Sequence, residues 1–210
     1  MSGNTASVNP AQPQNTDLVT YCNCMEEVRH RVGVICAVQS GQGSTGYPAF
    51  DIETIFLQFR KTLELIAFAS LTANKAEYSA QFVKFSAHWN AGWMLRDLEK
   101  VNPDFYPVSL QLPIQKPDGV KHLPLTADGF LTKDEFVSLY DKCGKALHAR
   151  NPFSTEAIPQ SEYTVEQWVA RIQILLRLHL VRLVNGDKWI VNIPNSGKIE
   201  GYSATPCDAL

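Results

Sequence analysis

Apolar residues at helical spacing lie along two sides of the segment from Asp51 to Asn74. Residues that recur every three or four positions share one face of an α-helix. One stripe consists of Ile52, Ile55, Phe56, Phe59, Leu63, Ile66 and Ala67, and the other side carries Leu57, Leu65 and Phe68. A helix that is apolar on two sides has to be covered on both. The segment therefore predicts a central helix or one at a subunit interface.

Four other segments also have helical patterns. They are Asp17 to about Ser40, Lys75 to Val101, a helix that begins at Thr132, and Thr164 to Leu183. Thr132 is followed three residues later by Glu135, which is a capping box. His179 falls on the apolar stripe of the last helix, so we expect a core histidine with its hydrogen bonds satisfied. These patterns predict a mainly α (α+β) fold built on a bundle of four to five helices.

Two segments have strand patterns and extend this bundle with short β-hairpins, one in the middle of the chain and one at its C-terminal end. Residues 106–126 flank the turn pair Asp118-Gly119, and residues 188–204 alternate apolar and polar side chains. Residues 1–17 are polar, and we expect a disordered tail. Residues 18–205 are then one helical domain with β-hairpin appendages near 106–126 and 188–204.

Composition excludes several classes of protein. The chain has 210 residues and a formal net charge of -2, so there is no overall attraction to nucleic acid or to an anionic membrane. No run approaches the length of a membrane span, and the N-terminal residues lack the apolar region of an export signal. The five cysteines have no metal-site or disulfide spacing. We therefore expect a cytoplasmic protein with no membrane contact, no metal and no cofactor.

The segment LYDKCGKALHARNPF, residues 139–153, contains the first candidate for chemistry. It reads as a helix that Pro152 ends, with His148 close to the break. Histidine is the side chain that titrates near neutral pH without any perturbation, so His148 is a candidate acid or base. The alternative is that His148 and Asn151 only cap the helix end and fix the turn that follows.

Polar residues around His148 are the candidates for binding. Asp141, Gly144 and His148 share one side of the helix, with Lys145 beside them, and Gly144 would let another group approach closely. A partner for His148 has to come from another helix. Arg60 and Glu64, one turn apart in FRKTLELIA, are the pair that we expect there. The alternative is that these two residues form a structural ion pair.

At these residues the chain resembles the HEPN class of small helical domains (higher eukaryote and prokaryote nucleotide-binding). The resemblance rests on the early RKTLE pattern and on the later helix that runs into DKCGKALHARNPF. The chain is also similar, over most of residues 20–205, to bacterial proteins of unassigned function with the blocks FRKTLELIA, LRDLEKVNPDFYP and LHARNPF. Many HEPN proteins are metal-independent ribonucleases with toxin or antiphage roles, and they are often homodimers.

The active motif of the class is an Arg followed, after four to six residues, by a His, paired across the dimer. The resemblance therefore implies His148 as the acid or base, Lys142 or Arg150 as the phosphate clamp, and Asn151 as a residue that positions RNA or a nucleotide. Lys142 stands where the class has Arg, and lysine lacks the bidentate fork of a guanidinium group. A non-catalytic dimeric interaction module is the alternative. An enzyme with a small-molecule pocket between the bundle and the hairpins is a third interpretation.

Overall fold

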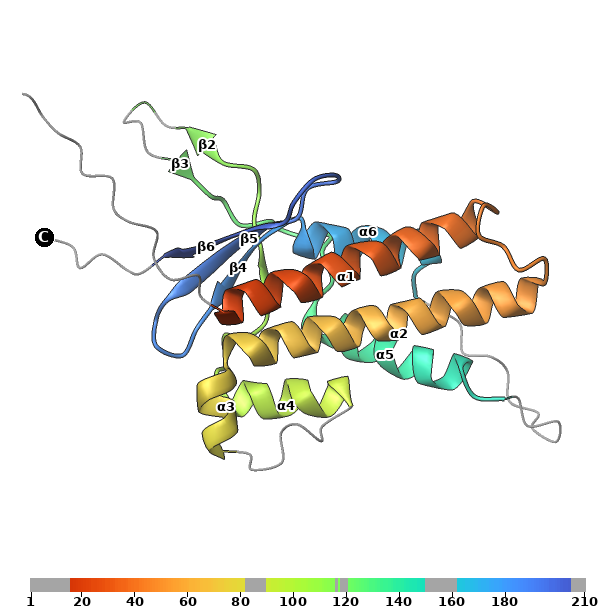
Figure 1. Cartoon of the computed structure of the whole chain (residues 1–210), viewed down its shortest axis with the longest axis horizontal. Helices are drawn as coiled ribbons and strands as arrows, with labels where there is room; N and C mark the ends of the chain where they lie inside the picture. Colours follow the sequence, from red (N-terminus) through yellow and green to blue (C-terminus); the bar gives the residue numbers. More distant parts are fainter. Residues whose placement is uncertain (1–15, 82–89, 116, 118–120, 150–161, 205–210) are drawn as a thin grey trace, which may run out of the picture.

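The computed structural model describes residues 16–81, 90–115, 117, 121–149 and 162–204. Its fold is mainly helical with a small antiparallel sheet, as the sequence predicts (Figure 1). The helices are α1 (Thr16–Gln39), α2 (Pro48–Ala73), α3 (Lys75–Gln81), α4 (Ala91–Val101), α5 (Lys133–Ala146) and α6 (Val165–Leu176). The strands are β1 (Val108–Ser109), β2 (Ile114–Gln115), β3 (Lys121–His122), β4 (Leu178–Arg182), β5 (Lys188–Asn192) and β6 (Glu200–Ala204). Three parts of the sequence lie wholly or mostly outside the described residues. They are the predicted tail, part of the predicted third helix with Phe82, Phe85 and Trp89, and the residues Arg150, Asn151 and Pro152.

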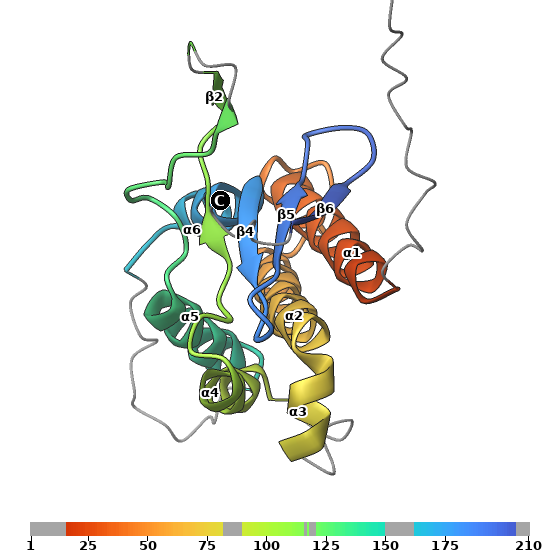
Figure 2. The ribbon, with the colours of Figure 1, turned by 90° about the vertical axis from the view of Figure 1, so that its left-hand side faces the viewer.

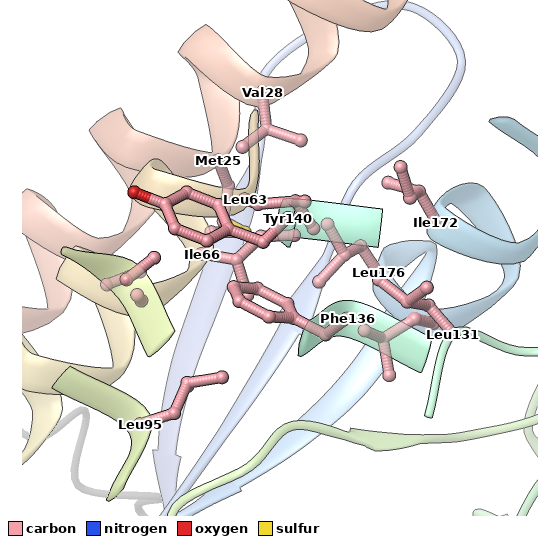
Figure 3. Close-up of a cluster of buried hydrophobic side chains, with 14 of the residues drawn as sticks. Met25, Val28, Leu63, Ile66, Leu95, Leu131, Phe136, Tyr140, Ile172 and Leu176 are labelled. Carbon is pink, nitrogen blue, oxygen red and sulfur yellow. The ribbon is translucent and has the colours of Figure 1, made fainter. Parts of the chain in front are cut away.

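Helix α2 lies in the centre of the molecule, with α1 on one side and α4 and α5 on the other (Figure 1). Phe59, Leu63 and Ile66 are buried on its inner faces. Their neighbours in the core come from the surrounding elements (Figure 3) and include Met25, Val28, Leu95, Leu131, Phe136, Ile172 and Leu176. The first turns of α2 are less covered, because Ile52 and Leu57 are exposed.

The helix predicted from Lys75 to Val101 is wrong as one continuous element. The chain forms α3 first, and α4 then starts anew after Asn90. The Asn90 side chain accepts a hydrogen bond from the Trp93 backbone N–H at 3.0 Å. Asparagine in this extended conformation satisfies a backbone donor that the first turn leaves free, so Asn90 begins a helix where the apolar pattern alone suggests continuation.

The helix predicted from Thr164 to Leu183 is too long. A capping box of Thr164 and Gln167 begins α6, but the helix ends at Leu176 and the chain continues as strand β4. In β4, His179 and Val181 are buried, whereas Leu180 and Arg182 are only half-buried. This alternation with a period of two is short enough to be mistaken for a helical stripe.

The four-stranded sheet has the order β1-β4-β5-β6 with all pairs antiparallel. The predicted C-terminal hairpin is confirmed as β5 and β6, and β4 extends it. The predicted middle hairpin is confirmed as β2 and β3, which pair through Ile114 with His122. Strand β1, from the same predicted segment, pairs with β4 instead. The capping box of Thr132 and Glu135 at the start of α5 is confirmed.

Helices α1 and α6 cover one face of this sheet. Tyr21 of α1 contacts the rings of His179 and Trp189, and the Ser109 hydroxyl donates to the Ile174 carbonyl of α6 at 2.7 Å. Ser109 and His179 are cross-strand neighbours and therefore point to the same face. None of the described helices is both long and apolar enough to cross a membrane.

His179 is a core histidine, as expected, but it lies on a strand rather than on a helix. Its Nε2 lies 2.8 Å from the Tyr21 hydroxyl, and its Nδ1 lies 2.8 Å from the Leu176 carbonyl. The carbonyl can only accept, so Nδ1 carries the proton and Nε2 accepts from Tyr21. Burial lowers the pKa of His179 from its ordinary value to about 4, and the hydrogen bond to Leu176 opposes this shift.

We expect this histidine to make the fold sensitive to acid. The unfolded chain takes up the proton near pH 6.5, whereas the folded chain takes it up only near pH 4. The free energy of unfolding should therefore fall by about 2 kcal/mol between pH 7 and pH 5 on account of this group. Urea unfolding at both pH values measures the difference.

His179→Gln should remove this part of the pH dependence, because glutamine does not titrate. His30→Ala is the matched control, since His30 is largely exposed on α1, and it should keep the dependence. Equal pH profiles for the wild type and His179→Gln would contradict the assignment.

Candidate functional site

Side chains from α2 and α5 form one polar cluster, which we call the α2–α5 cluster: Arg60, Glu64, Tyr140 and Gly144. The Arg60 Nε lies 3.2 Å from the Glu64 Oε1, and the Arg60 Nη2 donates to the Tyr140 hydroxyl at 3.2 Å. The Tyr140 hydroxyl donates to Glu64 at 3.3 Å. The arginine, the carboxylate and the phenol are thus mutually bonded, and the Arg60 guanidinium also lies 4.8 Å from the centroid of the tyrosine ring.

The cluster is partly shielded from solvent. The side chains of Arg60 and Glu64 are 33% and 14% exposed. A second cation, Lys61, lies 3.4 Å from the other oxygen of Glu64, so one carboxylate faces two positive charges. Together with Lys61, the cluster therefore carries one net positive charge, and the Arg60 side chain stays partly accessible.

Helix α4 also reaches this cluster, through Tyr140. Burial raises the pKa of Tyr140, while the Ala91 backbone N–H and the Arg60 charge lower it and Glu64 raises it. Ala91 is the first residue of α4, so the start of that helix points at the phenol oxygen. Burial also raises the pKa of the neighbouring Cys143 to about 12, against the opposing effect of Arg60. Cys143 therefore stays a neutral thiol near pH 7.

Gly144 is the place where Arg60 meets α5. A Cβ atom built on Gly144 would lie 3.5 Å from the Arg60 Nη1. This distance is an ordinary van der Waals contact, so the glycine gives Arg60 a close approach without being strictly required for it. The prediction that Gly144 lets another group come near the helix agrees with this contact.

His148 lies just beyond the end of α5. The helix has its C-cap at Leu147, and His148 is exposed. It follows Gly144 by four residues, or about 6 Å along a helix axis. Within the described part of the chain, we find no hydrogen-bond or ion-pair partner for its ring. His148 is therefore accessible from solvent, four residues after the place where Arg60 approaches α5.

Asp141 and Lys145 are exposed on α5 and do not join the bonded cluster. Arg150 and Asn151 lie outside the described residues, so their predicted roles have no structural description. Of the predicted site residues, the structure brings Arg60, Glu64 and the backbone at Gly144 together. His148 lies beyond them, just after the end of α5.

Lys142 lies on a different side of α5. Its Nζ lies 5.7 Å from the ring centroid of Trp168 and 3.9 Å from a carboxylate oxygen of Glu162. The side chain is 18% exposed, and the buried Nζ has no hydrogen-bond partner among the residues that the structure describes. In this conformation Lys142 does not present its ammonium group as a phosphate clamp next to Arg60.

The sequence analysis did not single out Tyr140 as a site residue. The ring is indeed buried, with 4% of the residue exposed, but its hydroxyl group joins Arg60 to Glu64. Its position one turn before Gly144 was the available signal, because residues four apart share a helix face. The part of α4 in this cluster, Ala91, had no signal in the sequence.

Among the described residues, no group of three or more His, Cys, Asp or Glu side chains could hold a metal ion. The chain matches no family model, no curated protein and no solved structure. The function is therefore argued from the geometry alone.

The contact between Arg60 and Gly144 gives a test by substitution. Gly144→Ala should raise the free energy of unfolding by about 0.5–1 kcal/mol, because alanine favours a helix interior and the new methyl group only touches Arg60. Chemical denaturation measures this change. Gly33→Ala in α1 is the matched control, since a Cβ atom there meets nothing within 4 Å. A destabilised Gly144→Ala next to a stabilised Gly33→Ala would show that Arg60 cannot yield.

The buried ammonium of Lys142 gives a second test. Lys142→Met should change the free energy of unfolding by no more than about 1 kcal/mol, because methionine fills the same space against Trp168 and removes a buried charge without hydrogen bonds. Thermal and urea unfolding measure the change.

Arg171→Met is the matched control for Lys142→Met. Arg171 makes two hydrogen bonds to Glu135, the longer of them 3.2 Å. Its loss should cost at least about 2 kcal/mol, because Glu135 would keep a half-buried charge without that cation. Equal losses in the two variants would contradict the view that Lys142 is weakly bonded.

Proposed function

We propose that the protein is an HEPN-like, RNA-directed domain with a bacterial toxin or defence role, cytoplasmic and homodimeric, in which His148 acts on the RNA backbone. The observation that carries the proposal is the exposed His148, four residues after the place where Arg60 approaches α5. This arrangement supplies an imidazole just beyond the end of α5 and a cation on α2, which are the kinds of group that phosphodiester cleavage needs.

The proposed reaction uses the 2′-hydroxyl group of the RNA as the nucleophile. His148 takes the proton of this hydroxyl group while the 2′ oxygen forms a bond to the phosphorus. The bond between the phosphorus and the 5′ oxygen breaks. The leaving 5′ oxygen takes up a proton from a solvent water molecule, and the other product is a 2′,3′-cyclic phosphate. Arg60 stabilises the negative charge that grows on the phosphate during the attack.

Arg60 replaces Lys142 as the cation in this proposal. The Lys142 ammonium is buried against Trp168, whereas Arg60 is one-third exposed and has a planar guanidinium suited to phosphate. Lys61 and Lys145 are exposed on the same two helices and add local positive charge. This local charge matters because the chain as a whole carries a net charge of -2.

Cleavage of a labelled single-stranded RNA in the presence of EDTA tests the proposal. His148→Ala should lower the rate by at least about 100-fold, as expected for the loss of a general acid or base. His30→Ala is the matched control, because His30 is another exposed histidine at a helix surface. Intact RNA after incubation with the wild type, or equal cleavage by His148→Ala, would refute the activity.

A non-catalytic interaction module is the second candidate. The observation that favours it is a group of exposed apolar side chains at the start of α2: Tyr47, Phe50 and Ile52. In that case the α2–α5 cluster and His148 are structural. His148→Ala would then lower the free energy of unfolding by about 1 kcal/mol through loss of a helix-end interaction, whereas a purely catalytic His148 would leave it unchanged.

A further inference from the structure

Helices α1 and α6 form two walls of a pocket. Helix α1 packs against β6, whereas α6 packs against β1 and β4 (Figure 2). The pocket lies between the two helices, next to the chain that leaves β5 at residues 193–195, and its volume is about 570 Å³. Small-molecule sites in proteins usually enclose roughly 300–1,000 Å³. The pocket is therefore large enough for a small organic ligand.

Hydrogen bonds hold the walls of this pocket in place from both ends. At one end the side chain of Gln39, the last residue of α1, donates to a carboxylate oxygen of Glu166 in the first turn of α6 at 2.5 Å. At the other end the Arg29 guanidinium donates to the carbonyl groups of Pro194 and Gly197 at 3.1 and 2.8 Å. Arg29 thus fixes the connection between β5 and β6, which forms the third wall, to α1. Small-molecule sites are usually pre-formed in this way.

The floor of the pocket is apolar, and Gly33 leaves its α1 wall open. Val28 and Val32 of α1 and Ile172 of α6 line the pocket, and all three belong to the core. A Cβ atom built on Gly33 meets nothing within 4 Å. No neighbour in the described part of the chain therefore requires a glycine here, although glycine within a helix destabilises it relative to alanine. The missing side chain keeps space free for the apolar part of a ligand.

The charged groups that line the pocket leave one cation in excess. Arg29 is neutralised, because both oxygens of Glu26 accept from its Nη2 at 2.6 and 2.8 Å. Arg177, the C-cap of α6, lines the pocket with an exposed side chain, and we find no hydrogen bond or ion pair for that side chain within the described residues. No Asp or Glu is among the described residues that line the pocket. The Arg177 guanidinium is thus placed to hold an anionic group through two parallel hydrogen bonds.

We propose that this pocket binds a small molecule with an apolar body and one anionic group, such as an aliphatic or aromatic carboxylate. The apolar body lies on the core residues of the floor, and the anionic group meets Arg177. The amide side chains of Gln173 and Asn195 line the same pocket and supply further hydrogen-bond donors. None of these residues belongs to the α2–α5 cluster, so the inference does not rest on the proposed RNA cleavage.

Fluorescence titration with 1-anilinonaphthalene-8-sulfonate tests the site, because this dye reports binding to apolar surface. N-phenyl-1-naphthylamine is its neutral counterpart and lacks only the sulfonate. The wild type should bind one sulfonate dye per chain with a saturable signal. It should bind this dye at least about threefold more tightly than the neutral dye, as expected for a hydrogen-bonded anion at a partly exposed arginine.

Gly33→Leu tests whether the dye occupies this pocket. The new side chain extends into open space, so the variant should fold, and by filling the pocket it should weaken binding of both dyes at least about tenfold. Val34→Leu is the matched control, because Val34 is an exposed neighbour on α1 that does not line the pocket. It should bind both dyes like the wild type. Circular dichroism and thermal unfolding establish that each variant is folded.

Arg177→Gln tests the charge of the ligand. This variant should weaken binding of the sulfonate dye at least about threefold and leave binding of the neutral dye unchanged. Arg96→Gln is the matched control, since Arg96 is an exposed arginine on α4, away from the pocket. It should bind both dyes like the wild type.

The exposed thiol of Cys36 gives a second measurement, because Cys36 also lines the pocket. The bound sulfonate dye should slow the alkylation of this thiol by iodoacetamide, which mass spectrometry follows on the peptide that contains Cys36. His148→Ala should bind both dyes like the wild type, which separates this test from the one for RNA cleavage.

Three results would overturn the proposal. One is a wild type without saturable binding of the sulfonate dye, and another is a folded Gly33→Leu variant that binds this dye as tightly as the wild type. The third is an Arg177→Gln variant that keeps the full preference for the sulfonate dye, because Arg177 would then not hold the anionic group.

Discussion

Phe59, Leu63 and Ile66 of α2 are shielded from solvent between α1 and the α4–α5 pair, and the positions of the other helices depend on this contact. Burial of each such side chain contributes about 1.5–3 kcal/mol. Because α2 is covered on both sides, it cannot rotate about its axis without exposing one set of these residues. Arg60 and Glu64 are therefore held on the flank of α2 that faces α5.

A polar group in this position has to find partners close by, because it has lost part of its hydration. Tyr140 supplies the partner: its ring belongs to the core (Figure 3), and its hydroxyl group bonds to both Arg60 and Glu64. The cluster thus joins the apolar core to the solvent-facing end of α5. The same bonds that satisfy the buried charge also fix the guanidinium next to the α5 backbone.

The sequence was sufficient to predict the elements that depend on local chemistry. The apolar stripes predicted α1 and α2, and the capping box of Thr132 and Glu135 marked the start of α5. Two predicted helix boundaries were wrong, because the sequence signal that opposed each helix was short. Asn90 starts a new helix within an apolar pattern, and Leu178–Arg182 is a strand only because β5 and β1 are present to pair with it. Such pairing depends on residues distant in the sequence, which helical periodicity does not report.

The site was harder to predict, because it depends on how helices face one another. Lys142 and His148 are six residues apart, and at 3.6 residues per turn they differ in direction by about a third of a turn. That relation holds only on a continuous helix, and α5 has its C-cap at Leu147, so helical spacing does not fix the direction of the His148 ring. Gly144 lies within α5, and a Cβ atom built on it would lie 3.5 Å from the Arg60 Nη1. The cation nearest to Gly144 thus comes from α2, a neighbouring helix, and the sequence spacing within α5 could not show this.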